Sequence, residues 1–147
     1  MNKKGVTLLE LIVVLVIIAI AATLAVPNIA AWLPNYRLRT ATRDIVSTMR
    51  TAQMKAVSTN LEHRVQFNAE AGSYIVQRRT TTGLGWVDDG VLQTIPSGIS
   101  FETDPAGYLA TFNPNSTSTS GTITLRNKRN TEKKIAVFAA TGRIRVE

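Results

Sequence analysis

An acidic side chain in an apolar run is the first feature of this sequence with chemical consequences. Glu10 follows Val6-Thr-Leu-Leu and precedes aliphatic residues that continue to Val26. An ionised carboxylate inside an apolar helix of membrane length is costly, so it is expected to have a function and a partner of opposite charge. The alternative is a chance acidic residue in a plain membrane anchor.

Two arginines near the C-terminus form the second candidate site. In Arg143-Ile-Arg-Val146 the alternation of a β-strand places Arg143 and Arg145 on one face, with their Cα atoms roughly 7 Å apart. Ile144 and Val146 then point to the opposite face, which can enter a core. Such a strand could contact the phosphates of DNA. It could also be an ordinary edge strand whose charges discourage aggregation.

Further basic side chains lie in the same segment. The net charge of the chain is +7, and the residues from Gly121 onward include seven basic and two acidic side chains. Besides the arginine pair, the basic residues are Arg126, Lys128, Arg129, Lys133 and Lys134. They could extend a phosphate-binding track or only solvate a turn. Phe138 is the one aromatic residue among them, so any DNA binding is expected to be weak, independent of base sequence and sensitive to salt.

Other kinds of site have little support in the sequence. His63 is the only histidine and there is no cysteine, so no set of transition-metal ligands and no disulfide is expected. Asp88 and Asp89, beside Trp86, are interpreted as turn residues. There is no glycine-rich phosphate loop and no nucleophile with a neighbouring base. The sequence therefore predicts neither an enzyme nor a cofactor.

One long helix must position the N-terminal site. Val6 to Val26 is 21 residues, about 32 Å as a helix, which suits a single transmembrane segment. Lys3 and Lys4 precede it and are expected to stay cytoplasmic. Pro27 is expected to kink the helix. Beyond it, apolar residues recur at three- and four-residue steps, which predicts a helix continuing to about residue 58 and packed on a domain.

Short strands must position the C-terminal site. After residue 60 the helical period disappears, and strand-like runs alternate with turn residues. The predicted strands are 64–67, 73–79, 85–87, 91–95, 99–102, 122–126, 135–139 and 143–146. Residues 113–120 are expected to form a polar flexible loop. The predicted fold class is α+β, with one long helix packed on antiparallel sheet.

The N-terminal residues resemble the class III signal of type IV prepilins. Gly5 is followed by Val6-Thr-Leu-Leu-Glu10 and a long aliphatic run, and Pro27 lies seventeen residues after the glutamate. The resemblance implies that a prepilin peptidase removes the leader 1–5 by cutting between Gly5 and Val6, and methylates the new amine. In family filaments the glutamate neutralises the terminal amine of a neighbouring subunit. Pairing of this kind is what allows a buried carboxylate to persist.

The rest of the chain is similar to the GspH/FimT domain of minor pseudopilins. The similar stretches are the helix end Ala52-Gln-Met-Lys-Ala56, Phe112, Gly121-Thr-Ile-Thr-Leu125, Lys134-Ile-Ala-Val-Phe138 and Gly142-Arg-Ile-Arg-Val146. The resemblance implies a type IV pilin-like fold, with a transmembrane or filament-core helix 6–33 and a periplasmic domain 34–147. It also implies a single-pass protein of the bacterial inner membrane. The implied partners are other pilin or pseudopilin subunits, the prepilin peptidase and the inner-membrane assembly platform.

The resemblance leaves three functions open. The first is a structural minor pilin or pseudopilin, in a type IV pilus or a type II secretion pseudopilus. The second is a DNA-binding minor pilin. In the FimT branch the Gly-Arg-x-Arg motif belongs to DNA capture during natural transformation, and this role would carry over to Arg143 and Arg145 and make double-stranded DNA a partner. The GspH branch shares much of this hairpin and serves protein secretion. The third possibility is a membrane-anchored periplasmic domain that never polymerises.

Overall fold

The computed structural model describes residues 5–83, 85–102 and 109–147, without the side chains of residues 24–30. The chain divides into two compact units, Met1–Leu33 and Pro34–Glu147. The first unit contains the first half of helix α1 (Leu8–Thr59), and the second contains the rest of that helix and all the described strands. Within the described residues, no helix has an apolar stretch long enough to cross a membrane.

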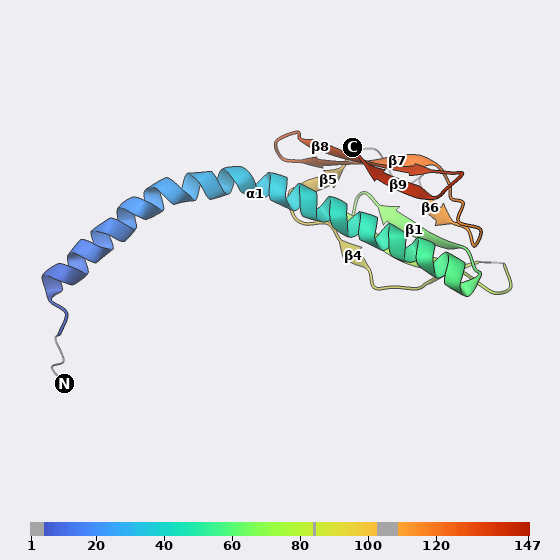
Figure 1. The fold of residues 1–147 in the computed structure, drawn as a ribbon, viewed down its shortest axis with the longest axis horizontal. Helices are drawn as coiled ribbons and strands as arrows, with labels where there is room; N and C mark the ends of the chain where they lie inside the picture. Colours follow the sequence, from blue (N-terminus) through green and yellow to red (C-terminus); the bar gives the residue numbers. More distant parts are fainter. Residues whose placement is uncertain (1–4, 84, 103–108) are drawn as a thin grey trace. The chain divides into compact units, whose positions relative to one another are not determined.

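Helix α1 runs without interruption from Leu8 to Thr59 (Figure 1). At its start the hydroxyl of Thr7 accepts a hydrogen bond from the N–H of Glu10 at 3.2 Å, which satisfies one of the free donors of the first turn. At its end Asn60 takes a left-handed conformation with φ of 55°, a common way to terminate a helix. The expected kink at Pro27 lies outside the described side chains and stays a prediction.

The strands form two antiparallel sheets. Sheet A has the order β3-β2-β1-β6, and β4 pairs with the other end of β2. Its strands are β1 (His63–Asn68), β2 (Ser73–Arg79), β3 (Trp86–Asp88), β4 (Gln93–Thr94) and β6 (Ala110–Phe112). Sheet B has the order β5-β7-β8-β9. Its strands are β5 (Ile99–Phe101), β7 (Gly121–Asn127), β8 (Glu132–Phe138) and β9 (Arg143–Val146). The predicted fold class of α+β is confirmed.

Three strands differ from the sequence-based expectation. Strand β6 was not predicted, because a three-residue strand followed by Asn-Pro carries almost no signal of its own and forms by pairing with β1. The predicted strand 91–95 shrinks to β4, and Val91 and Leu92 before it remain exposed. Strand β8 starts at Glu132, three residues early, because its pairing with β7 continues as far as Arg126.

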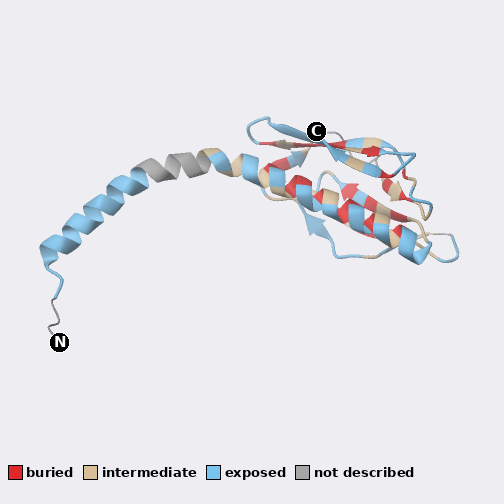
Figure 2. Ribbon diagram, viewed as in Figure 1, coloured by how far each residue is buried: buried red, intermediate tan, exposed pale blue. Residues whose placement is uncertain are grey.

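The second half of α1 and the inner faces of both sheets share one hydrophobic core (Figure 2). The helix contributes the apolar residues whose spacing predicted this face: Leu38, Ala41, Ile45, Met49, Ala52 and Ala56. The strands contribute fully buried side chains such as Val65, Phe112, Ile123, Leu125 and Ile135. Because strand side chains alternate, the polar residues between these positions face outward and are free to form a functional surface.

Candidate functional site

The N-terminal site lies on a helix that is apolar on every side. Gly5 and Glu10 are exposed, and Val6 is 72% exposed. The large apolar side chains between Leu8 and Ile20 are between 49% and 76% exposed. A helix of this kind has to bury its surface in lipid or against other helices. No basic side chain among the described residues pairs with Glu10.

The arginine pair lies on the outward face of sheet B. Strand β9 is an edge strand, and its register places Arg143 opposite Phe138 and Arg145 opposite Ala136 of β8. Ile144 packs against the core, so the alternation of the strand turns both arginines to solvent, as predicted. Val146, predicted to be inward, is 44% exposed. It has a neighbour on only one side, because β9 ends the sheet.

The remaining basic residues do not form a single track with this pair. Lys134 shares the outward face, since its strand neighbour Ile135 is buried. The backbone N–H and C=O groups of Lys134 exchange hydrogen bonds with those of Glu147, the residue that follows β9. This pairing places Lys134 diagonally beside Arg145. Lys133 alternates with Lys134 and therefore points to the opposite side of the sheet. The side chains are therefore divided between the two faces of the hairpin.

Two further basic residues, Lys128 and Arg129, lie in the turn between β7 and β8. Asn127 shapes this turn, because its Oδ1 accepts hydrogen bonds from the N–H groups of Arg129 and Thr131, both at 2.9 Å. Asn127 also connects the turn to helix α1, because its Nδ2 donates a hydrogen bond to Asn35 Oδ1 at 2.9 Å. The turn is thus at the opposite end of β8 from the β8–β9 turn that precedes the arginine pair.

Arg126 is on the outward face but is neutralised by carboxylates. Its Nη2 lies 2.9 Å from Glu102 Oε1 and 2.8 Å from Glu132 Oε1. The hydrogen bond to Glu132 raises the pKa of Arg126, because it favours the charged guanidinium. The side chain is therefore engaged within the sheet. Among the seven basic residues, Lys134, Arg143 and Arg145 form an outward cluster in the described part of sheet B that is not held by close ion pairs. The one ion pair in this cluster is long, with Arg145 Nε 3.6 Å from Glu147 Oε1.

Gly142 fixes the turn that presents this cluster. It has φ of +59°, a conformation that other residues rarely adopt. A Cβ atom there would lie 2.5 Å from Gln53 Nε2 and 2.7 Å from the backbone oxygen of Ser116. The β8–β9 turn is therefore packed between the end of α1 and the loop 113–120. The sequence shows the glycine but not the two groups that make it necessary.

A polar cluster of one buried and two half-buried side chains was missed by the sequence-based prediction. The His63 side chain is fully buried; its Nδ1 lies 3.0 Å from the carbonyl oxygen of Leu61. Its Nε2 lies 3.3 Å from Asp89 Oδ2, within ion-pair range but without the alignment of a hydrogen bond. Lys55 Nζ donates to the same oxygen at 2.8 Å and to the Asp89 carbonyl at 2.9 Å. This hydrogen bond lowers the pKa of Asp89. The cluster joins α1, β1 and the segment after β3.

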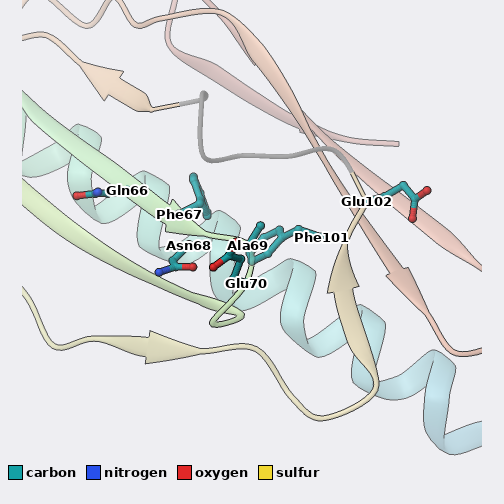
Figure 3. Close-up of a pocket in the computed structure, with 7 residues that line it drawn as sticks. All are labelled: Gln66, Phe67, Asn68, Ala69, Glu70, Phe101 and Glu102. Carbon is teal, nitrogen blue, oxygen red and sulfur yellow. The ribbon is translucent and has the colours of Figure 1, made fainter.

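A cavity in the described part of the chain lies away from the arginine pair and from Glu10. A pocket of about 610 Å³ opens between the β1–β2 turn and the end of β5 (Figure 3). Its wall includes Phe67 and Phe101, whose rings meet edge-on with centroids 5.7 Å apart, and the carboxylates of Glu70 and Glu102. Glu102 is already paired with Arg126. No group of three or more His, Cys, Asp or Glu side chains suited to a metal ion occurs in the described ranges.

Comparison with known proteins adds two family matches. Residues 1–26 match the prokaryotic N-terminal methylation motif, and residues 41–142, well over half of the chain, match the type II transport protein GspH. No match was found among curated proteins.

Solved structures show the same fold. The minor pseudopilin EpsH from the type 2 secretion system of Vibrio cholerae has a TM-score of 0.63 at 11% identity, over 76% of this chain and 96% of that chain. The type IV minor pilin FimU of Pseudomonas aeruginosa has a TM-score of 0.57 at 18% identity, over 77% of this chain and 90% of that chain. At these identities the likeness establishes the fold alone.

Proposed function

The chain belongs to the family of the type II transport protein GspH, and we propose from this that it is a minor pilin or pseudopilin subunit of a filament. The filament is a type IV pilus or a type II secretion pseudopilus. The observation that carries the proposal is the helix that is exposed and apolar on every side, with Glu10 in its first turn. Such a helix is suited to pass from a membrane into a bundle of like helices.

In this proposal the N-terminal residues prepare and direct assembly. A prepilin peptidase cuts between Gly5 and Val6, and Glu10 pairs with the amine that is freed at Val6 of a neighbouring subunit. Breaking a buried ion pair by removing one partner costs about 3–5 kcal/mol, because the other charge is left uncompensated. A glutamate in an apolar bundle therefore selects subunits that are processed and correctly placed. The inner-membrane assembly platform would supply the subunits to the growing filament.

The location follows from the same proposal. Residues 6–33 anchor the chain in the inner membrane before assembly, and residues 34–147 lie in the periplasm. The methylation motif at residues 1–26 supports this arrangement. The bend expected at Pro27 would allow the anchor and the globular unit to take different directions.

The test is a change of charge at Glu10 in cells that carry the complete machinery. Glu10→Gln keeps the size of the side chain and removes its charge, so filament incorporation should fall at least tenfold while the protein still fractionates with membranes. Glu70→Gln makes the same change on an exposed turn of sheet A and should leave incorporation unchanged. Incorporation is measured by shearing filaments and immunoblotting the pellet. Unchanged incorporation of Glu10→Gln would contradict the assembly role.

A second role, binding of double-stranded DNA, is supported by the outward cluster of Lys134, Arg143 and Arg145. Binding is measured by anisotropy of a labelled duplex with the full-length chain in detergent. Arg143→Ala/Arg145→Ala should lower affinity for unrelated duplexes equally and reduce the slope of log K against log salt by about 1.8, since each phosphate contact contributes about 0.9. Arg126→Ala is the control, because that side chain is held by two glutamates. If the double variant binds like wild type, the hairpin does not hold DNA.

A further inference from the structure

We propose that the solvent-facing side of the second half of α1 is a docking surface for an acidic segment of a neighbouring filament subunit. The surface, called here the helix stripe, consists of Arg39, Arg43, Arg50, Met54 and Val57. All five side chains are exposed, and Met54 and Val57 are 65% and 50% exposed. The identification of the partner as a filament subunit rests on the proposed function.

The five residues form one continuous strip. At 100° per residue they fall within about 60° of the helix circumference, and from Arg39 to Val57 they extend about 27 Å. The core residues of the same helix, such as Ile45 and Ala52, lie on the other side of it. The strip is therefore a long and narrow surface, of a size that an extended segment or a second helix could cover.

The arginines of the helix stripe have no counter-ion within the described residues. Acidic side chains form the recorded ion pairs with Lys55, His63, Arg78, Arg79, Arg126 and Arg145 instead. Asp44 is the one acidic residue in this half of the helix, and it acts on Tyr74 of sheet A, where its charge helps to raise the pKa of that tyrosine after burial. Arg39 and Arg43 also stand one turn apart, and like charges at this spacing weaken a helix. A partner that carries carboxylates would reverse this unfavourable term.

The apolar end of the helix stripe indicates a protein rather than a nucleic acid. Met54 and Val57, with Gln53, Ser58 and Ser116, line an open pocket of about 340 Å³. A phosphate backbone has no apolar group to fill such a pocket, whereas a protein segment can insert a leucine or phenylalanine beside its carboxylates. Five carboxylates of this chain are already paired internally: Glu62, Asp89, Glu102, Glu132 and Glu147. The described acidic residues of the globular unit without an ion pair, Asp44, Glu70 and Asp88, lie on helix α1, in the β1–β2 turn and on β3, so a second copy of this chain offers no acidic segment and is a poor partner.

The direct test measures binding of defined peptides to the full-length chain in detergent. The probe is a labelled peptide of glutamate pairs alternating with leucines, and the comparison peptide carries serine in place of each leucine. The leucine peptide should bind at least tenfold more tightly. Arg43→Glu/Arg50→Glu should weaken both peptides at least tenfold. Met54→Gln/Val57→Gln should weaken only the leucine peptide. Lys128→Glu/Lys133→Glu makes the same charge change elsewhere and should have an effect below threefold.

Two results would overturn the proposal. One is equal binding of the two peptides, or displacement of the leucine peptide by duplex DNA at matched charge, which would make the helix stripe a general polyanion surface. The other is full incorporation of Arg43→Glu/Arg50→Glu into filaments, which would remove the subunit as its partner. Thermal unfolding like that of wild type shows that the variant is folded. Peptide binding is measured on the isolated chain and does not depend on filament assembly, whereas Glu10→Gln tests assembly itself. The two proposals can therefore be refuted independently of each other.

Discussion

Replacement of Gly142 by alanine tests whether the turn that presents the arginine pair is packed as the structure shows. An alanine at φ of +59° costs about 1 kcal/mol in backbone conformation. The added Cβ would also lie 2.5 Å from Gln53 Nε2 and 2.7 Å from the Ser116 backbone oxygen. The glutamine can swing away, but the backbone oxygen moves only with its loop, and overpacking of this kind costs about 1–3 kcal/mol. We expect a total loss of about 3 kcal/mol.

Gly83→Ala is the matched control. Gly83 has φ of +72°, but no atom of the described chain lies within 4 Å of the position of its Cβ. It carries the backbone cost alone, about 1 kcal/mol. For a domain of this size, with a midpoint shift of about 4 °C per kcal/mol, the unfolding midpoint should fall by about 12 °C for Gly142→Ala and about 4 °C for Gly83→Ala.

The assay is thermal unfolding of the full-length chain in detergent, followed by near-ultraviolet circular dichroism. Adding Gln53→Ala to Gly142→Ala should restore only the part of the loss due to the glutamine, and a double-mutant cycle measures that part. Equal midpoints for Gly142→Ala and Gly83→Ala would refute the reasoning. The turn would then not be clamped between the helix end and the loop 113–120, and the position of Arg143 would not be set by packing.

Three further outcomes are expected. Asp89→Asn should lower the free energy of unfolding by about 0.5–1 kcal/mol at pH 7, because it removes the ionic partner of Lys55 from a pair that solvent partly screens. The native pKa of Asp89 is lowered, so its contribution to the free energy of unfolding is complete above the unfolded pKa near 3.9 and is lost as the pH falls below that value. Urea unfolding between about pH 3 and 7 should therefore show a smaller loss of stability toward acid pH in the variant than in wild type. An equal loss in both proteins would contradict the pairing. Phe112→Ala, which empties a fully buried site, should cost about 3–5 kcal/mol in the same titration, and a cost below about 1 kcal/mol would place that ring outside the core. Arg64→Ala removes a guanidinium 4.2 Å from the Trp86 ring and should change its fluorescence with a loss of about 0.5–1 kcal/mol, whereas identical spectra would mean that the two groups do not touch in solution.

The accuracy of the sequence-based prediction differs between the secondary-structure elements. The helix was predicted to within about two residues at each end, because its apolar run and the three- and four-residue period that follows are long, local features. The hairpin of β8 and β9 was also predicted, since buried and exposed residues alternate along it. Strand β6 was missed, because its pairing partner lies far away in the chain and no local pattern records it. Strand β4 was predicted, but as the longer run 91–95.

The same difference between local and long-range features separates the two candidate sites. Glu10 and its register with Gly5 are local features of one segment, so the sequence alone identified them and their family. The seven basic residues near the C-terminus were also found in the sequence, which left open whether they extend a phosphate-binding track or only solvate a turn. Arg126 is held by two carboxylates, one of which, Glu102, belongs to another strand. Charge along a chain says nothing about which charges meet across a sheet.

The sequence by itself determined the class of protein, the long helix and the placement of Arg143 and Arg145 on one face of a strand. These depend on spacing between near neighbours, which helix and strand periods translate directly into direction. Only the tertiary structure decided that Gly142 is clamped by Gln53 and Ser116, and that His63, Asp89 and Lys55 meet. It also decided which of the described arginines form ion pairs with carboxylates. Those outcomes depend on contacts between residues far apart in the chain, and such contacts are set by packing rather than by any local pattern.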